Sequence, residues 1–149
     1  MHGYALVLFY AFLVLSVISA SIKGGPPERW GASIILLMLA FELEGRAFVP
    51  DRLHSVDPLA VVIDGFGTVS FGILALYARR AWPIWATALQ ILSATSHFAQ
   101  GVDPAAHPGI YIVMKSGPTF FVLLVLLAGT VAHQRRLQRD GNDPAWMKW

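Results

Sequence analysis

The chain contains no cysteine among its 149 residues, which excludes disulfide bonds, thiolate catalysis, cysteine-ligated zinc and iron–sulfur clusters. It is also poor in charge, because only 13% of its residues are Asp, Glu, Lys or Arg, whereas 56% are hydrophobic. No basic groove with interleaved aromatic residues is present, so we expect no nucleic-acid binding. The mean hydropathy of +0.58 is too high for an ordinary soluble domain, so the composition predicts a chain that resides in a lipid bilayer.

Hydrophobic runs punctuated by proline and glycine divide the chain into five segments. A helix rises 1.5 Å per residue, so about 20 residues cross the roughly 30 Å hydrocarbon layer of a membrane. Asp57 followed by Pro58 has the pattern of an N-cap with proline at the first helical position. The predicted spans are residues 4–21, 29–49, 58–77, 83–102 and 109–133. The sequence therefore predicts an all-α integral membrane bundle of five transmembrane helices within residues 1–133, followed by a short polar cytoplasmic tail over residues 134–149.

Basic residues are divided unequally between the two sets of connections that these spans would create. One set holds only Arg46 and Arg52. The other set holds Lys23, Arg29, Arg79, Arg80, Arg135, Arg136, Arg139 and Lys148. Because lysine and arginine concentrate in cytoplasmic loops, this distribution predicts a multi-pass protein of the inner (plasma) membrane, with its N-terminus outside and its C-terminus in the cytoplasm.

Four of the spans each carry one ionisable residue at a similar depth. Glu42, Asp64, His97 and Lys115 lie five to seven positions inside the outer ends of their segments, which places them roughly 8 to 11 Å below the outer boundary. An unpaired charge at such a depth costs at least a few kcal/mol. We therefore expect these groups to face the interior and to form an outward-facing polar pocket, whereas we expect the cytoplasmic half of the bundle to be almost purely apolar.

Helical spacing adds further residues to this pocket. Gln90, Ser93, His97 and Gln100 recur at intervals of three, four and three, which draws one polar stripe along a single helix face. Arg46 follows Glu42 by four positions, so the two side chains can form an ion pair. The predicted ligand-binding residues are Glu42, Arg46, Asp64, Gln90, Ser93, His97, Gln100 and Lys115.

A proline interrupts the fifth span beside Lys115. Pro118 has no N–H to donate to the carbonyl of Met114. We therefore expect a kink or a short unwound turn between Lys115 and Thr119, a feature that often accompanies ligand or ion sites in membrane proteins.

The residues do not favour a metal or another cofactor. Glu42, Asp64 and His97 could supply carboxylate and imidazole ligands for zinc, manganese or iron, but the chain has no HxxxH or ExxH ligand pair, and Lys115 would repel a cation. A haem held by two histidines is disfavoured because only His97 lies well inside a span. We predict no metal and no cofactor.

The polar layer is open to several functional interpretations. It could be purely structural, with Asp64 paired to Lys115 and Glu42 paired to Arg46. The first hypothesis is a ligand-binding or accessory subunit of a membrane assembly, homo-oligomeric or part of a larger complex. Its pocket would hold a small ligand, such as a lipophilic one, or a lipid headgroup, an ion or a partner side chain. A second is a small intramembrane enzyme with isomerase- or cyclase-type acid–base chemistry, in which Asp64, Glu42 and His97 would be catalytic. A third is an oligomeric transporter or an ion or proton-relay component.

Overall fold

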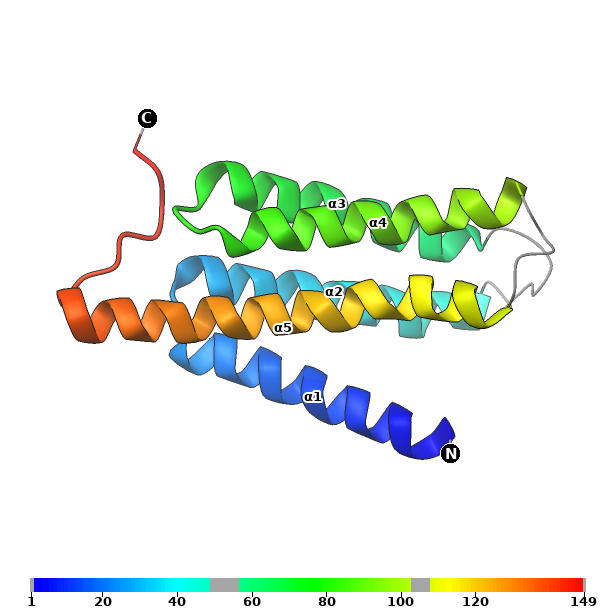
Figure 1. Ribbon diagram of the computed structural model, residues 1–149, viewed down its shortest axis with the longest axis horizontal. Helices are drawn as coiled ribbons and strands as arrows, with labels where there is room; N and C mark the ends of the chain where they lie inside the picture. Colours follow the sequence, from blue (N-terminus) through cyan, green and yellow to red (C-terminus); the bar gives the residue numbers. More distant parts are fainter. Residues whose placement is uncertain (1, 49–56, 103–107, 149) are drawn as a thin grey trace.

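The structure, a computed structural model, describes residues 2–48, 57–102 and 108–148, and this part of the chain is all-helical. The helices run side by side, and the two ends of the chain lie at opposite ends of the bundle (Figure 1). The five helices of the described residues are α1 (His2–Lys23), α2 (Pro26–Phe48), α3 (Pro58–Tyr77), α4 (Trp82–Val102) and α5 (Pro108–Asp140). The predicted all-α class is confirmed.

Helices α2 to α5 form a ring, in which α2 packs on α3, α3 on α4, α4 on α5, and α5 on α2. Contacts are most extensive between α4 and α5 and between α3 and α4, and α1 packs against both α5 and α2. In Figure 1, α1 leans away from the other helices toward its N-terminus. The polar stripe predicted on α4 therefore belongs to the most densely packed part of the molecule.

Proline and glycine set several of the helix boundaries. Asp57 caps α3, because its Oδ1 accepts hydrogen bonds from the backbone N–H groups of Leu59 (3.1 Å) and Ala60 (3.4 Å), as the Asp57–Pro58 pattern predicts. Gly141 follows the end of α5 with a φ of 69°, a conformation that glycine adopts without a steric penalty. Its N–H donates to the carbonyl of Leu137 at 3.0 Å.

Helix α5 differs from the expectation in two respects. It is helical without interruption from Pro108 to Asp140, with Pro118 inside it, so the short unwound turn predicted around Pro118 is not formed. Proline removes a single backbone hydrogen bond, and the remaining backbone hydrogen bonds of a long helix can hold it together across that position. The helix also ends at Asp140 rather than near His133, so the polar residues beyond the apolar run belong to the same helix.

Glycines allow close packing around Trp82 at one end of the bundle. The indole lies between Gly31 of α2 and Gly129 of α5, and a Cβ atom added at either glycine would overlap it. The ring also packs edge-on against Phe71, with the ring centroids 6.2 Å apart. Trp82, which is 6% exposed, thereby ties α4 to α2, α3 and α5.

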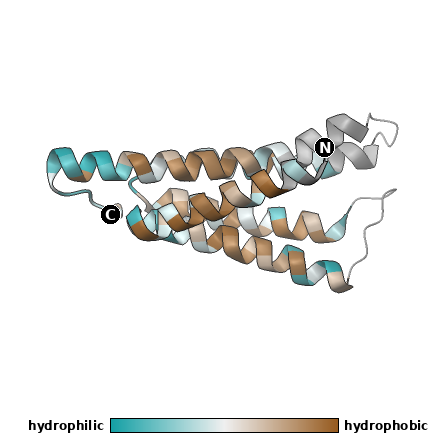
Figure 2. Ribbon diagram, turned by 90° about the horizontal axis from the view of Figure 1, so that it is seen from below, coloured by the Kyte–Doolittle hydropathy of each residue, from teal (hydrophilic) through white to brown (hydrophobic). Residues whose placement is uncertain are grey.

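The outer surface of the bundle is strongly apolar. Two helical stretches in the described part, Pro58–Tyr77 and Gly117–Asp140, are long and apolar enough to cross a membrane, and Val7–Lys23 is a shorter apolar helix. Figure 2 shows hydrophobic residues along the middle of the bundle and hydrophilic residues toward its ends. Large side chains such as Val62 and Val69 are more than 60% exposed.

Candidate functional site

Helices α3 and α4 bring Asp64, Ser93 and His97 into one hydrogen-bonded cluster, which we call the Asp64 cluster. Oδ2 of Asp64 accepts a hydrogen bond from Ser93 Oγ at 2.6 Å and lies 3.0 Å from Nε2 of His97. Ser93 and His97 are one helical turn apart, so both reach the same carboxylate. Asp64 is 9% exposed, Ser93 1% and His97 0%, which means that the whole cluster is buried.

The contact with Asp64 constrains the roles of the two imidazole nitrogens. If the carboxylate is ionised, it only accepts hydrogen bonds, and Nε2 of His97 carries the proton of this contact. In the neutral ring, Nδ1 is then an acceptor. Nδ1 is buried and has no hydrogen-bond partner in the described part of the chain, so the inner face of His97 presents an acceptor without a donor.

Gln90 extends the same polar face of α4 toward the middle of the bundle. Its Nε2 donates to Met38 Sδ at 3.4 Å, and it fits closely over Gly67, where a Cβ atom would lie 2.7 Å from Nε2. Its Oε1 is buried and lacks a partner within the described residues. The stripe predicted on α4 is therefore buried at Gln90, Ser93 and His97, and two of its atoms, His97 Nδ1 and Gln90 Oε1, have no hydrogen-bond partner among the side chains and backbone that the structure describes.

The arrangement does not form a nucleophilic triad. Ser93 donates to Asp64 and not to His97, whereas a serine nucleophile needs its hydroxyl hydrogen-bonded to the histidine base. What the cluster can do is hold a proton on the Asp64–His97 pair and accept hydrogen bonds from a bound group.

Glu42 lies in a second polar group instead of the Asp64 cluster. Arg46 Nη2 contacts Glu42 Oε1 at 2.7 Å, and Arg46 Nη1 contacts Asp57 Oδ2 at 2.7 Å. The predicted i, i+4 pair of Glu42 and Arg46 is therefore formed. It draws the Glu42 carboxylate, 39% exposed, toward Arg46 and the N-cap of α3, and this local neutralisation explains why Glu42 does not share a site with Asp64.

Two predicted site residues cannot be placed. The side chains of Gln100 and Lys115 lie outside the described residues, so the Asp64–Lys115 ion pair stays a prediction. Among the side chains that the structure describes, no group of three or more histidine or acidic residues could hold a metal ion. Glu42, Asp64 and His97 therefore do not form the ligand set considered from the sequence.

The opposite end of the bundle holds a buried ionic group that the sequence analysis missed, which we call the basic-end cluster. It consists of Glu28, Arg80, His133, Arg136 and Asp143. Arg80 contacts Glu28 at 3.3 Å and Asp143 at 2.7 Å. Asp143 also contacts His133 at 2.6 Å and Arg136 at 3.0 Å. The expectation of an almost purely apolar half is therefore wrong at this end.

The basic-end cluster is formed by residues far apart in the chain. Glu28, which is 0% exposed, accepts a hydrogen bond from Trp82 Nε1 at 3.0 Å and lies 52 residues before Arg80. Gly25 leaves room for it, since a Cβ atom there would lie 3.1 Å from Glu28 Oε2 and 2.9 Å from His133. The proximity of Glu28 to Pro26 and Pro27 indicates that it lies at the start of a helix, but no sequence signal indicates that it is buried.

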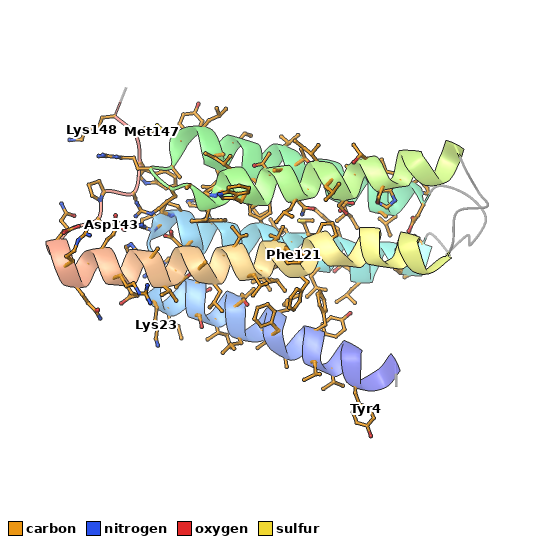
Figure 3. The ribbon with its side chains drawn as sticks, in the orientation of Figure 1. Tyr4, Lys23, Phe121, Asp143, Met147 and Lys148 are labelled. Carbon is orange, nitrogen blue, oxygen red and sulfur yellow. The ribbon has the colours of Figure 1, made fainter. Side chains whose placement is uncertain are left out.

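The segment after α5 folds back onto the connection between α3 and α4. Arg79 N–H donates to the carbonyl of Ala145 at 3.0 Å, and Met147 N–H donates to the carbonyl of Tyr77 at 2.8 Å. Arg80 also donates to the carbonyl of Pro144 at 2.9 Å. In Figure 3, Asp143, Met147 and Lys148 lie at the same end of the molecule as Lys23, and Tyr4 lies at the other end.

Charge at the basic-end cluster stabilises the ionised form of Asp143. Burial by itself would raise the pKa of this carboxyl group, but hydrogen bonds from His133 and Arg136 and the charge of Arg80 outweigh it, so the pKa lies below its ordinary value of 3.8. The Asp143 carboxylate is therefore the acidic group that holds the C-terminal segment to the bundle at neutral pH.

Comparison with known proteins gives no relative from which a role could be transferred: no family model, curated protein or solved structure matches the chain.

Proposed function

We propose that this chain is a five-span protein of the inner (plasma) membrane, with its N-terminus outside and its C-terminus in the cytoplasm. The exposed apolar middle of the bundle supports a lipid surrounding. The gathering of Lys23, Arg29 and Arg79 at the end where α1 and α3 finish and α2 begins supports the orientation.

We further propose that it acts as a ligand-binding or accessory subunit, with the Asp64 cluster as its binding site. The observation that carries this proposal is the pair of buried acceptors, His97 Nδ1 and Gln90 Oε1, that have no donor in the described part of the chain. A buried polar atom without a partner costs about 1–3 kcal/mol. A bound small molecule that donates hydrogen bonds through a hydroxyl or amine group would remove that cost.

The chemistry of the cluster defines the ligand class. The carboxylate on α3, together with the imidazole and the amide oxygen on one face of α4, favours a small lipophilic molecule with one or two donor groups. The route from the outer surface stays a prediction, because residues 103–107 between α4 and α5 lie outside the described part.

Two buried serines on α4 provide a matched test of this site. Ser93 donates to Asp64 at 2.6 Å, whereas Ser96 donates to the backbone carbonyl of Ser93 at 2.6 Å. Native mass spectrometry of the protein purified from membranes in a mild detergent should detect one retained non-lipid small molecule. We expect Ser96→Ala to keep this molecule and Ser93→Ala and His97→Gln to lose about tenfold or more of its occupancy, since a hydrogen bond to a charged group contributes about 1.5–3 kcal/mol.

The opposite results would exclude the binding role. Equal occupancy in wild type, Ser93→Ala and His97→Gln would show that any retained molecule binds elsewhere. A folded wild-type protein that carries no small molecule in any mild detergent would leave the Asp64 cluster as a structural feature.

A second candidate function is intramembrane acid–base catalysis, which the 3.0 Å contact between Asp64 and His97 favours. This pair could move one proton at a lipophilic substrate, without help from Glu42, which belongs to the other polar group. Conversion of a retained molecule to a product of equal mass, abolished by Asp64→Asn, would favour the enzyme over the binding protein.

The transporter hypothesis gains no comparable support. Between the Asp64 cluster and the basic-end cluster the core contains Phe71, Leu74, Leu123 and Leu126, which are all buried and apolar. A conducting path would need polar groups or water at this level.

A further inference from the structure

A groove runs along the outer surface between α2 and α3 near the basic end of the bundle; we call it the α2–α3 groove. Its α2 wall extends from Trp30 to Leu37 and its α3 wall from Phe66 to Tyr77. Trp146 and Met147 of the C-terminal segment line it as well, and its volume is about 570 Å³. The small side chains Ser33 and Ser70 lie among these larger neighbours, which hollows the surface at this point.

The length of the groove matches one leaflet of a bilayer. From Phe66 to Tyr77 the α3 wall rises roughly 16 Å at 1.5 Å per residue, and half of the roughly 30 Å hydrocarbon layer is about 15 Å. The groove therefore covers the depth of the leaflet at the basic end and stops near the middle of the membrane.

Its shape fits a single lipid chain better than a protein helix. A helix with its side chains is about 10 Å across, so a volume of this size corresponds to little more than one helical turn. A helix that continued toward the basic end would also meet Trp146 and Met147, which are held there by the backbone hydrogen bonds to Tyr77 and Arg79. A flexible acyl chain has neither restriction.

Aromatic side chains line the end of the groove, and exposed basic residues are close to them in the sequence. Arg29 precedes Trp30 on α2, Arg79 follows Tyr77 after α3, and Lys148 follows Met147 in the C-terminal segment, and all three are exposed. Trp30 and Tyr77 are 61% and 55% exposed, as expected of aromatic side chains at the level of lipid headgroups. A negatively charged headgroup would be attracted to this rim, by about 1 kcal/mol for each lysine or arginine.

We propose that the α2–α3 groove binds one anionic phospholipid of the leaflet at the basic end, with an acyl chain against Ser33 and Ser70 and its phosphate at the rim of Arg29, Arg79 and Lys148. This inference rests on the proposed membrane location, but not on the Asp64 cluster. The C-terminal segment lines the groove at the headgroup end, so the bound lipid and the segment share an interface.

Native mass spectrometry with two defined lipids tests this site. Delipidated protein is mixed with equal amounts of dioleoylphosphatidylglycerol and dioleoylphosphatidylcholine. We expect wild-type protein to retain one phosphatidylglycerol, with about tenfold preference over phosphatidylcholine. Ser70→Phe fills the groove and should lower this retention about tenfold, whereas Val69→Phe, on the neighbouring face of the same helix and 63% exposed, should leave it unchanged.

A second pair of variants tests the groove if the first groove-filling variant does not fold. If Ser70→Phe does not fold by circular dichroism, Ser33→Phe fills the groove from the α2 side, and Leu36→Phe is its exposed control. The double variant Arg79→Gln/Lys148→Gln should abolish the preference for phosphatidylglycerol while a lipid is still retained.

Three outcomes would overturn the lipid site: equal retention of the two lipids by the wild type, unchanged retention in both groove-filling variants, or an equal loss in the control variants. Alkaline carbonate extraction of membranes separates this failure from failure of the proposed location. Protein that carbonate releases would refute the membrane location itself, whereas protein that stays in the membrane but retains no phosphatidylglycerol would refute only the lipid site.

Discussion

Two adjacent arginines in the connection between α3 and α4 have very different surroundings. The side chain of Arg79 is exposed, whereas that of Arg80 is 3% exposed and lies between the carboxylates of Glu28 and Asp143. Burying a charge is tolerated only where the surrounding groups compensate it, and removing one partner leaves the others without that compensation. Arg80 is therefore the residue on which the basic-end cluster depends most.

Replacement of these arginines should separate the two environments. We expect Arg80→Met to lower the free energy of unfolding by about 3–5 kcal/mol, because Glu28 and Asp143 both lose their contact with the guanidinium. The matched variant Arg79→Met should change it by less than about 0.5 kcal/mol. Thermal or denaturant unfolding in a mild detergent measures both, and equal effects of the two variants would show that the cluster contributes nothing specific to stability.

Individual residues were predictable from the sequence where their partners are local or lie at the same depth. The Glu42–Arg46 pair follows from a spacing of four, and Asp64 and His97 were expected to lie together because both are a similar distance inside their spans. The contact between Glu28 and Arg80 was not predicted, because 52 residues separate them and no periodic pattern connects them. That His97 Nδ1 and Gln90 Oε1 have no donor among the described residues also depends on packing that no sequence pattern records.

At the scale of helices and connections, hydrophobic runs and proline positions predicted most of the elements. The bounds of α3 agree with the prediction at both ends, and Asp57 caps it as expected. The end of α5 and the course of the C-terminal segment were not predictable, because a polar sequence after an apolar run can continue a helix or leave it. Tertiary contacts decide here: Asp143 contacts Arg80, and the carbonyl of Ala145 accepts a hydrogen bond from the N–H of Arg79, both in the connection between α3 and α4.

Acidification should detach the C-terminal segment. The pKa of Asp143 is lower in the folded protein than its ordinary value of 3.8, so its stabilising contribution is complete above that value and is lost as the pH falls through the lowered pKa. Below it, a neutral Asp143 no longer compensates the charges of Arg80 and Arg136, and the two guanidinium groups repel one another.

A spin label can follow this detachment because the chain has no other cysteine. With the label attached at Lys148→Cys, electron paramagnetic resonance should show restricted motion at pH 7 and free motion at a pH low enough to protonate Asp143. Adding Asp143→Asn should give free motion at both pH values. An identical, restricted spectrum under all four conditions would show that Asp143 does not hold the segment.

In the whole molecule, the proposed membrane protein has two different ends. One end carries the basic-end cluster, the C-terminal segment and most of the basic residues, and the other lies nearer the Asp64 cluster. The proposed ligand site and the proposed lipid site then belong to opposite leaflets. Both assignments depend on the number of spans and on their direction.

Single cysteines introduced into the cysteine-free chain measure this arrangement directly. Ala47, Ala81 and Gln138 are exposed and lie, respectively, at the outer end of α2, between α3 and α4, and near the end of α5. Each variant is treated with a membrane-impermeant maleimide in spheroplasts, before and after permeabilisation. We expect Ala47→Cys to be labelled in intact spheroplasts, and Ala81→Cys and Gln138→Cys to be labelled only after permeabilisation. Labelling of Ala47→Cys and Gln138→Cys from the same side would contradict the five-span arrangement.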